Sequence, residues 1–170
     1  KSFQMMKTKL GLFSNHKNDV NLIQSLEDNL QLVETDMTIF FRNLSDFSDE
    51  KTAFGLIKNA FYTLENISSN VKNEWHLWFK NYNSRLQQES LSAAQRKEKM
   101  NAVNPKYILR NYMSQMAIDE ADKGNYTLID ELFKLLKKPY SEQPENVKWF
   151  AKRPEWARNK VGCSMLSCSS

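Results

Sequence analysis

Apolar residues recur at three- and four-residue steps along most of the chain, the spacing of residues on one face of an α-helix. The longest run predicts a helix from about residue 70 to about residue 89. Its apolar face carries six large side chains: Val71, Trp75, Trp78, Phe79, Tyr82 and Leu86. Lys72 and Lys80 lie among the polar residues opposite, so this helix is expected to bury one face and hydrate the other.

Shorter helices are predicted nearer the N-terminus. One begins after Asn18 or Asp19, either of which can accept hydrogen bonds from free backbone amides. Its apolar positions are Val20, Ile23, Leu26, Leu30 and Val33. Asp36 is expected to cap another helix, through Phe40 and Leu44. The first residues also show helical spacing directly from Lys1, which suggests a chain cut inside or beside an element.

A helical hairpin is predicted near residues 104–138. Asn104 is expected to cap its first helix, with Pro105 at the first helical position, where a missing N–H breaks no hydrogen bond. Gly124 can adopt the left-handed conformation that ends a helix, and Thr127 is expected to cap the second helix. The second helix faces inward with four leucines: Leu128, Leu132, Leu135 and Leu136.

Beyond the hairpin the pattern changes, because Pro144 and Pro154 permit only short helical turns. Aromatic residues are expected to hold this segment to the helices as an irregular strap: Trp149, Phe150 and Trp156. Alternating patterns typical of strands are absent from the sequence. We therefore expect an all-α fold: a single irregular multi-helix domain over residues 1–158, then a flexible tail over residues 159–170.

Composition and charge narrow the function classes. The hydrophobic content of 41% and charged content of 26% are ordinary for a globular protein, and no apolar run approaches the roughly 20 residues that span a bilayer. We therefore expect no membrane partner. The net charge is +4, and Lys and Arg gather between Lys134 and Lys160. This excess favours a solvated face over a nucleic-acid site, because no zinc-finger spacing or RNA-binding sheet motif accompanies it.

Residues for catalysis or metal binding are hard to assemble. His16 and His76 are far apart in the sequence, and Cys163 and Cys168 form a C-x4-C pair without two further matched ligands. The carboxylates near Asp119 are expected to serve as a polar helix surface. The sequence predicts no catalytic, cofactor-binding or metal-ligating residue in these 170 positions.

Four segments carry a resemblance to a known family. They are NPKYILRNY at residues 104–112, KKPYSEQP at 137–144, RPEWA at 153–157 and the terminal CSS. In these segments the chain resembles the C-terminal region of the selenoprotein O family. The resemblance implies a larger kinase-like protein, of the pseudokinase kind, that transfers AMP from ATP to Ser, Thr or Tyr hydroxyls of proteins.

The same resemblance implies that ATP and Mg²⁺ or Mn²⁺ bind upstream of Lys1. No phosphate-covering glycine loop or Asp-Phe-Gly triplet occurs in these residues. We therefore expect this chain alone to be inactive, with the upstream kinase-like domain as its partner and protein substrates reached through the whole protein. Arg110, inside the first segment, is expected to hold a carboxylate across the hairpin or to fix this region on that domain.

Cys168 is the one candidate site residue. Eukaryotic members of the family carry selenocysteine at this position, and the resemblance implies a redox bond from it to a cysteine of the catalytic domain. A Cys163–Cys168 disulfide and two unreactive thiols remain as alternatives. Cysteine in place of selenocysteine resembles the bacterial branch, which implies a bacterial cytoplasmic protein.

Two functions stay open from the sequence. In the first, the chain is the helical scaffold and redox tail of a protein adenylyltransferase whose catalytic core lies outside it. In the second, it is an independent helical module that binds an acidic protein surface or nucleic acid.

Overall fold

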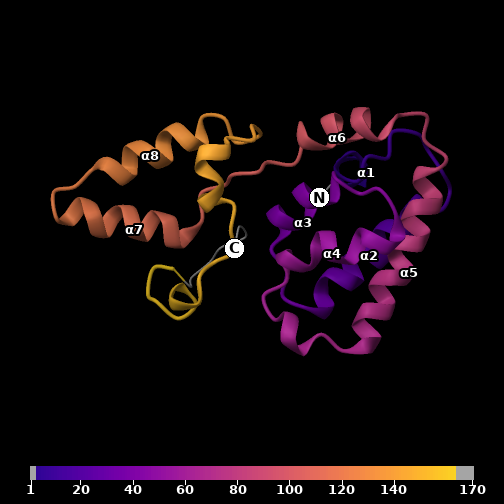
Figure 1. The fold of residues 1–170 in the computed structure, drawn as a ribbon, viewed down its shortest axis with the longest axis horizontal. Coiled ribbons are helices and arrows are strands. Elements are labelled where there is room, and N and C mark those ends of the chain that lie inside the picture. The colour runs from indigo at the N-terminus through magenta and orange to yellow at the C-terminus, as the bar shows by residue number, and fades with distance from the viewer. Residues whose placement is uncertain (1–2, 164–170) are drawn as a thin grey trace. The chain divides into compact units, whose positions relative to one another are not determined.

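The computed structural model describes residues 3–163 (Figure 1). Within this range the regular structure is helical, and the one β-type pairing is an isolated bridge between Thr35 and Phe61. The all-α class is confirmed. Residues up to Asn104 form one compact unit, and residues from Pro105 onward form a second, so each is described by itself.

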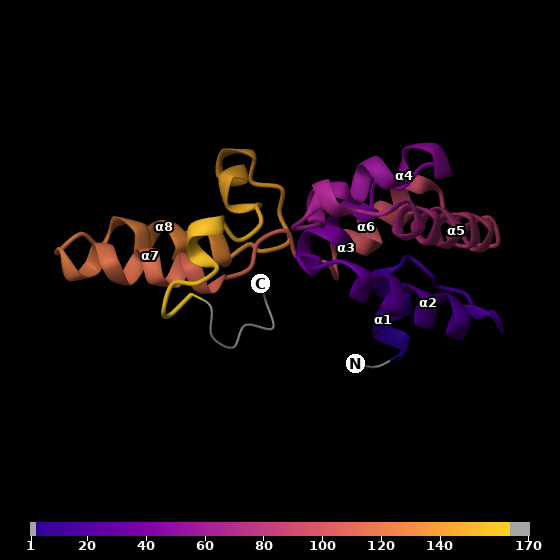
Figure 2. The same cartoon turned by 90° about the horizontal axis from the view of Figure 1, so that it is seen from below.

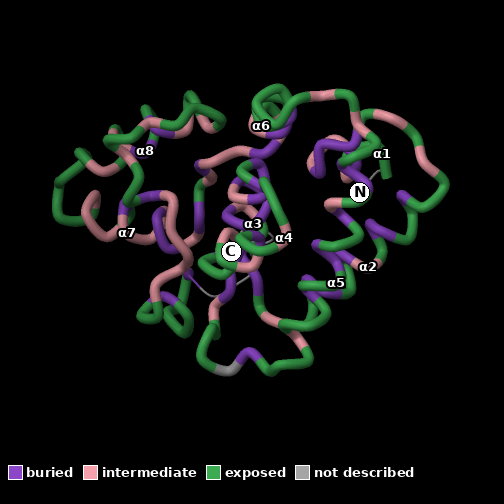
Figure 3. Tube along the Cα trace, turned by 45° about the vertical axis from the view of Figure 1, so that its right-hand side comes forward, coloured by how far each residue is buried: buried purple, intermediate pink, exposed green. Residues whose placement is uncertain are grey.

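The first unit is built around α5, which runs between α4 and α2 in Figure 2 and packs against both. Its elements are α1 (Phe3–Lys9), α2 (Asp19–Leu32), α3 (Met37–Leu44), α4 (Glu50–Ile57), the 3-10 turns η1 (Lys58–Ala60) and η2 (Leu64–Asn66), α5 (Ser69–Leu86) and α6 (Ala93–Asn101). In Figure 3 buried and exposed positions alternate along α2 and α5, as expected for helices with one face in the core.

The large aromatic residues of α5 form the centre of this core, as their spacing predicts. Trp75, Trp78, Phe79 and Tyr82 are each at most 2% exposed. Two of the four have backbone partners for their polar atoms: Trp78 Nε1 donates to Leu22 O at 3.1 Å, and Tyr82 Oη donates to Leu10 O at 2.7 Å. Trp75 Nε1 is buried without a hydrogen-bond partner among the described residues. Burial raises the pKa of Tyr82. The aromatic core therefore also fixes α2 and the end of α1 against α5.

N-terminal caps were predicted for α2 and α3. Asp36 caps α3, since its Oδ1 accepts a hydrogen bond from Ile39 N at 3.0 Å. Asn18 precedes α2 but makes no side-chain capping bond there. Val20, predicted on the buried face of α2, is 60% exposed, so that assignment was wrong. The Asp19 carboxylate faces the interior instead, which turns the next residue toward water.

The second unit contains the predicted helical hairpin, formed by α7 (Asn111–Asp122) and α8 (Thr127–Leu136). Gly124 ends α7 with φ +82°, as predicted. Two 3-10 turns follow, η3 (Pro144–Trp149) and η4 (Glu155–Ala157). The buried cluster of this unit joins the hairpin to the strap: Tyr107, Tyr112, Met113, Ala117, Leu132, Leu135, Trp149, Ala157 and Cys163.

The hairpin begins later than its sequence predicts. Asn104 does not cap a helix: its Oδ1, the atom that would accept a capping bond, has no hydrogen-bond partner among the described residues, and its Nδ2 donates to Lys9 O at 3.0 Å. The backbone amides of Lys106 and Tyr107 both donate to Pro139 O, at 2.9 and 3.1 Å. These bonds compete with a helical path after Asn104, so α7 starts only at Asn111.

The cap predicted for the second helix of the hairpin was also wrong. The helix begins at Thr127 itself, and Asn125 Oδ1 accepts the hydrogen bond from Thr127 N at 3.1 Å. An asparagine just after the Gly124 turn is well placed for this role, because its short amide side chain readily bonds the backbone two residues on.

Candidate functional site

Cys168, the one predicted site residue, lies outside the described residues, and its redox role stays a prediction. Cys163 is described and is 2% exposed within the buried cluster of the second unit. Its backbone amide donates to Lys160 O at 3.0 Å. The structure describes residues 159–163 of the predicted tail. Within them, the thiol of Cys163 is buried in the core of the second unit.

Contacts with α7 hold the segment that leads to Cys163. Lys160 Nζ lies 2.9 Å from Asp119 Oδ2, and this pairing raises the pKa of Lys160 and lowers that of Asp119. Gly162 has φ +88°, and a Cβ on it would lie 2.4 Å from Gln115 Oε1. Only glycine fits this approach without a shift of Gln115.

Four charged side chains meet in the first unit, where α1, α2, α5 and the loop after α1 come together. They are Lys7, Asp19, Arg85 and Glu89, and each side chain is at most 6% exposed. Arg85 joins the two acids: its Nε lies 2.6 Å from Asp19 Oδ1, and its Nη1 lies 2.8 Å from Glu89 Oε1. We call these four residues the Arg85 network.

The Arg85 network also fixes the loop that follows α1. Lys7 Nζ donates to Ser14 O at 2.7 Å and to Asn15 Oδ1 at 2.6 Å, and it lies 3.2 Å from Asp19 Oδ2. Arg85 Nη2 donates to the same Ser14 carbonyl at 2.9 Å. Glu89 Oε1 accepts from Ser14 N at 3.0 Å and from Ser14 Oγ at 2.6 Å. Ser14 is thus held by three charged side chains.

Both acids of the network stay ionised despite their burial. Burial alone opposes ionisation of Asp19, but hydrogen bonds from Arg85, His16 and Lys7 outweigh it and lower the pKa of this carboxyl. Burial likewise opposes ionisation of Glu89, and the bonds from Ser14 and Arg85 hold its pKa below the ordinary value. The pKa of Arg85 is raised, because its bonds to the two carboxylates exceed its own burial cost.

Ser14 and His16 superficially resemble a nucleophile and its base, since His16 Nε2 lies 3.2 Å from Ser14 Oγ. The hydroxyl proton of Ser14, however, points to Glu89 Oε1 at 2.6 Å. His16 is then a donor to Ser14 and cannot take that proton. Asp19 and Glu89 are equally unsuited as general bases, because their oxygens already accept bonds from cations and amides.

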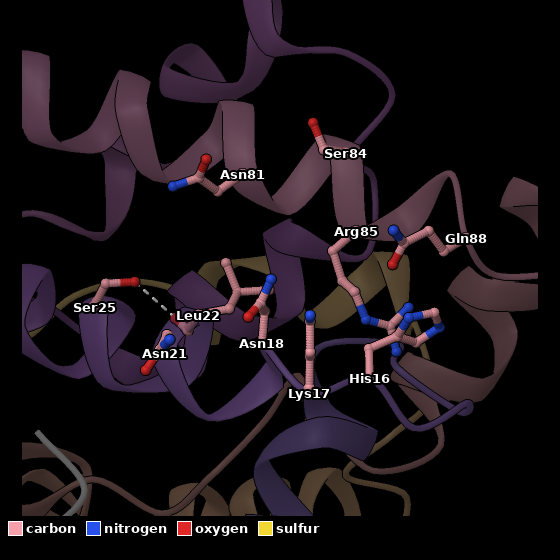
Figure 4. A pocket seen from close by; sticks show the side chains of 10 residues that line it. All are labelled: His16, Lys17, Asn18, Asn21, Leu22, Ser25, Asn81, Ser84, Arg85 and Gln88. Carbon is pink, nitrogen blue, oxygen red and sulfur yellow. Dashed lines mark hydrogen bonds between the residues drawn. The ribbon is translucent and has the colours of Figure 1, made fainter.

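A pocket of about 620 Å³ opens beside the network, between residues 16–18, α2 and α5 (Figure 4). Its lining is mostly amide, hydroxyl and basic: His16, Lys17, Asn18, Asn21, Leu22, Ser25, Asn81, Ser84, Arg85 and Gln88. Leu22 is the single aliphatic side chain among them. The size is typical of small-molecule sites in proteins.

The histidines that sequence reasoning singled out have ordinary surroundings. His16 lies at the pocket, and His76 is exposed on α5 with its ring 6.0 Å from that of Phe54. Within residues 3–163 no group of three or more His, Cys, Asp or Glu side chains could hold a metal ion. Arg110 is 2% exposed and precedes α7 as its N-cap residue.

Several basic side chains between residues 134 and 160 lie against aromatic rings and carboxylates. Lys148 Nζ is 2.7 Å from Glu131 and 5.2 Å from the Trp149 ring centroid. Lys137 and Lys160 lie over the rings of Phe133 and Trp156, at 4.5 and 5.4 Å. These lysines therefore already have partners within the second unit. None of the described helices is long and apolar enough to span a membrane.

Sequence reasoning missed the Arg85 network, although one signal was available. Arg85 lies three residues after Tyr82 and seven after Trp78, on the face that the pattern assigns to the core. A charged residue there requires a buried partner. Glu89, four residues later, was the local candidate.

Comparison with known proteins agrees with the resemblance found in the sequence. The family model described as Protein adenylyltransferase SelO matches residues 1–137. Relatives named Protein nucleotidyltransferase YdiU include that of Flavobacterium johnsoniae, 57% identical over 98% of this chain and 33% of the relative. Those of Aromatoleum aromaticum and Rhodopirellula baltica are 42% and 43% identical over 98% of this chain and 32% and 33% of their own length.

The chain therefore spans about a third of the length of the curated relatives it matches. The family model extends over well more than half of the chain. The chain belongs to the SelO family of protein adenylyltransferases.

Proposed function

We propose that these residues form the C-terminal helical scaffold of a protein that transfers AMP from ATP to hydroxyl side chains of other proteins. One observation carries the scaffold role: the charged groups of the Arg85 network bond one another and a loop. Two further buried arginines act in the same way. Arg42 Nη1 donates to Asn104 O at 2.9 Å, and Arg96 Nη2 donates to Phe47 O at 2.7 Å.

The chemistry of AMP transfer is assigned to the rest of the protein. Such a reaction needs groups that hold the phosphates, carboxylate or amide ligands for Mg²⁺ or Mn²⁺, and a base for the accepting hydroxyl. The described acids of the first unit's core are engaged in structural bonds. We propose that ATP, the metal and the protein substrate bind in the part of the protein that this chain does not cover.

Cys168 supplies the proposed redox function. In this proposal its thiol forms a disulfide with a cysteine of the catalytic part, in a bacterial cytoplasmic protein. The two thiols lose two electrons and two protons to a disulfide oxidant such as oxidised glutathione, which leaves as two thiols. The burial of Cys163 supports Cys168 as the reactive cysteine, because a thiol buried in a core undergoes thiol–disulfide exchange slowly.

A docking role is the second candidate. Tyr126, Ile129 and Phe133 are 61%, 42% and 62% exposed at three- and four-residue steps along one side of α8, with Lys137 beside Phe133. This surface suits either the remaining part of the protein or an acidic protein partner. Binding that weakens with salt and persists without the catalytic part would favour the acidic partner.

The test uses a fusion in which this chain replaces the matching third of the Flavobacterium johnsoniae relative. Transfer of radiolabelled AMP from ATP to protein is measured for the fusion and for the relative truncated before that third. We expect the fusion to be active and the truncated protein to be inactive or unfolded. Full activity of the truncated protein would contradict a scaffold role.

The redox part is tested on the same fusion with oxidised glutathione or dithiothreitol. We expect a disulfide at Cys168 by mass spectrometry and a change of AMP transfer on reduction. Cys168→Ser should remove both effects, whereas Cys163→Ser should leave the disulfide in place. A crosslink that survives Cys168→Ser would contradict the assignment.

A further inference from the structure

Several polar side chains that line the pocket beside the Arg85 network make no hydrogen bond or ion pair within the described residues. These side chains are Lys17, Asn18, Asn21, Asn81 and Gln88. Figure 4 shows them coming from the loop before α2, from α2, from α5 and from the turn that follows α5. Polar side chains from separate segments therefore line one concave surface.

The charge of this surface is positive. Lys17 supplies this charge, because Arg85 is paired with Asp19 and Glu89, and none of the ten side chains that line the pocket is a carboxylate. The neighbouring Asp19 and Glu89 do not offset Lys17, because both acids are bonded to Arg85 on the buried side. An anionic ligand is therefore favoured over a cationic or neutral one.

The other groups that line the pocket indicate which class of anion it suits. An ammonium group such as that of Lys17 binds phosphate as a point charge, while the four amides offer donors and acceptors that suit hydroxyl groups. Apart from the His16 imidazole no aromatic ring lines the pocket, so a nucleobase has little on which to stack.

We propose that this pocket binds a small phosphate-bearing polyol, the sugar-phosphate class of ligand. Lys17 contacts the phosphate, and the amides of Asn18, Asn21, Asn81 and Gln88 contact the hydroxyl groups. Arg85 holds the wall of the site in place through its bonds to Asp19 and Ser14. This site is separate from the nucleotide chemistry proposed above and does not depend on it.

The test is a titration of the full ¹⁵N-labelled 170-residue chain with ribose 5-phosphate, followed by NMR. The probes for comparison are inorganic phosphate and ribose, at roughly millimolar concentrations. We expect saturable shifts of the side-chain amide signals of the four pocket amides with ribose 5-phosphate and smaller shifts with ribose. Equal binding of inorganic phosphate would identify free phosphate as the ligand and overturn the polyol part.

Matched variants locate the binding. Lys17→Gln should weaken binding at least about tenfold, and Asn81→Ala should weaken ribose 5-phosphate more than inorganic phosphate. Lys72→Gln is the control, because Lys72 is an exposed lysine of α5 that does not line the pocket. The absence of saturable shifts, or equal weakening by Lys72→Gln, would overturn the proposal. AMP transfer plays no part in this readout, so the two proposals fail independently.

Discussion

Arg85 Nε donates to Asp19 Oδ1 at 2.6 Å, and the two side chains are 6% and 1% exposed. The residues are 66 positions apart, and their bond joins the first turn of α2 to the last turn of α5. Removing one member of a buried pair leaves the other charge without compensation, which costs more than the pair contributes.

Asp19→Asn is therefore expected to destabilise the chain strongly. The change leaves Arg85 and Lys7 with a neutral neighbour, and the expected loss is roughly 3–5 kcal/mol of unfolding free energy. Urea unfolding followed by tryptophan fluorescence measures it. The control is Asp46→Asn, which removes the exposed ion pair with Lys97 and should cost less than about 1 kcal/mol. Equal losses in the two variants would contradict the buried role of Asp19.

Stability should fall in acid because of Asp19 and Glu89. Both folded-state pKa values lie below their ordinary values, so the unfolded chain binds protons more readily than the folded chain. Their contribution is complete above about pH 5 and is lost as the pH falls below about 4. The raised pKa of Arg85 adds no change near neutral pH. Melting temperatures between pH 7 and pH 3 test this.

The pH dependence also has a matched control. Glu89→Gln should reduce the loss of stability at acid pH, because it removes one of the two carboxyls of the Arg85 network whose pKa is lowered. Glu65→Gln changes an exposed acid of the same unit and should leave the slope unchanged. If acid lowered the stability of the Glu89→Gln variant as much as that of the unchanged chain, Glu89 would not be responsible for the loss.

Leu132→Ala should destabilise the helical hairpin. Leu132 is 4% exposed within the buried cluster of the second unit, and its truncation leaves a cavity worth roughly 2–5 kcal/mol. Phe133→Ala is the neighbouring control, since Phe133 is 62% exposed. Denaturant unfolding should separate the two variants clearly, and a larger loss from Phe133→Ala would show that α8 is packed the other way round.

The thiol of Cys163 should react slowly in the folded chain. Its burial limits access to reagents, and its reaction with a disulfide reagent should accelerate only when denaturant is added. The Cys168→Ser chain isolates this thiol, because the sequence contains two cysteines. Val161→Cys in the double Cys→Ser background is an exposed reference, since Val161 is 86% exposed. Rapid modification of Cys163 at the reference rate would contradict its burial.

Sequence periodicity predicted the helices that carry large apolar residues at regular steps. α5 and its aromatic core were predicted because Trp75, Trp78, Phe79 and Tyr82 recur on one face. The late start of α7 was not predictable in this way. It depends on the bonds of Lys106 and Tyr107 to Pro139, a contact between segments more than thirty residues apart.

The candidate sites depend even more on distant contacts. The Arg85 network joins Lys7 and Asp19 to the far end of α5, and local spacing indicates only its Arg85–Glu89 pair. The pocket takes its lining from residues near 17 and near 85, which only the packing of α2 against α5 brings together. Resemblance, by contrast, identified the family correctly from a few short segments.

The scaffold role is tested most directly by AMP transfer by this 170-residue chain alone, measured with radiolabelled ATP, Mg²⁺ or Mn²⁺ and a protein substrate. We expect no transfer by the chain and clear transfer by its fusion to the remaining two-thirds of the Flavobacterium johnsoniae relative. Transfer by the chain alone, abolished by a substitution within it, would show that a complete nucleotide site lies in these residues and would contradict the scaffold role.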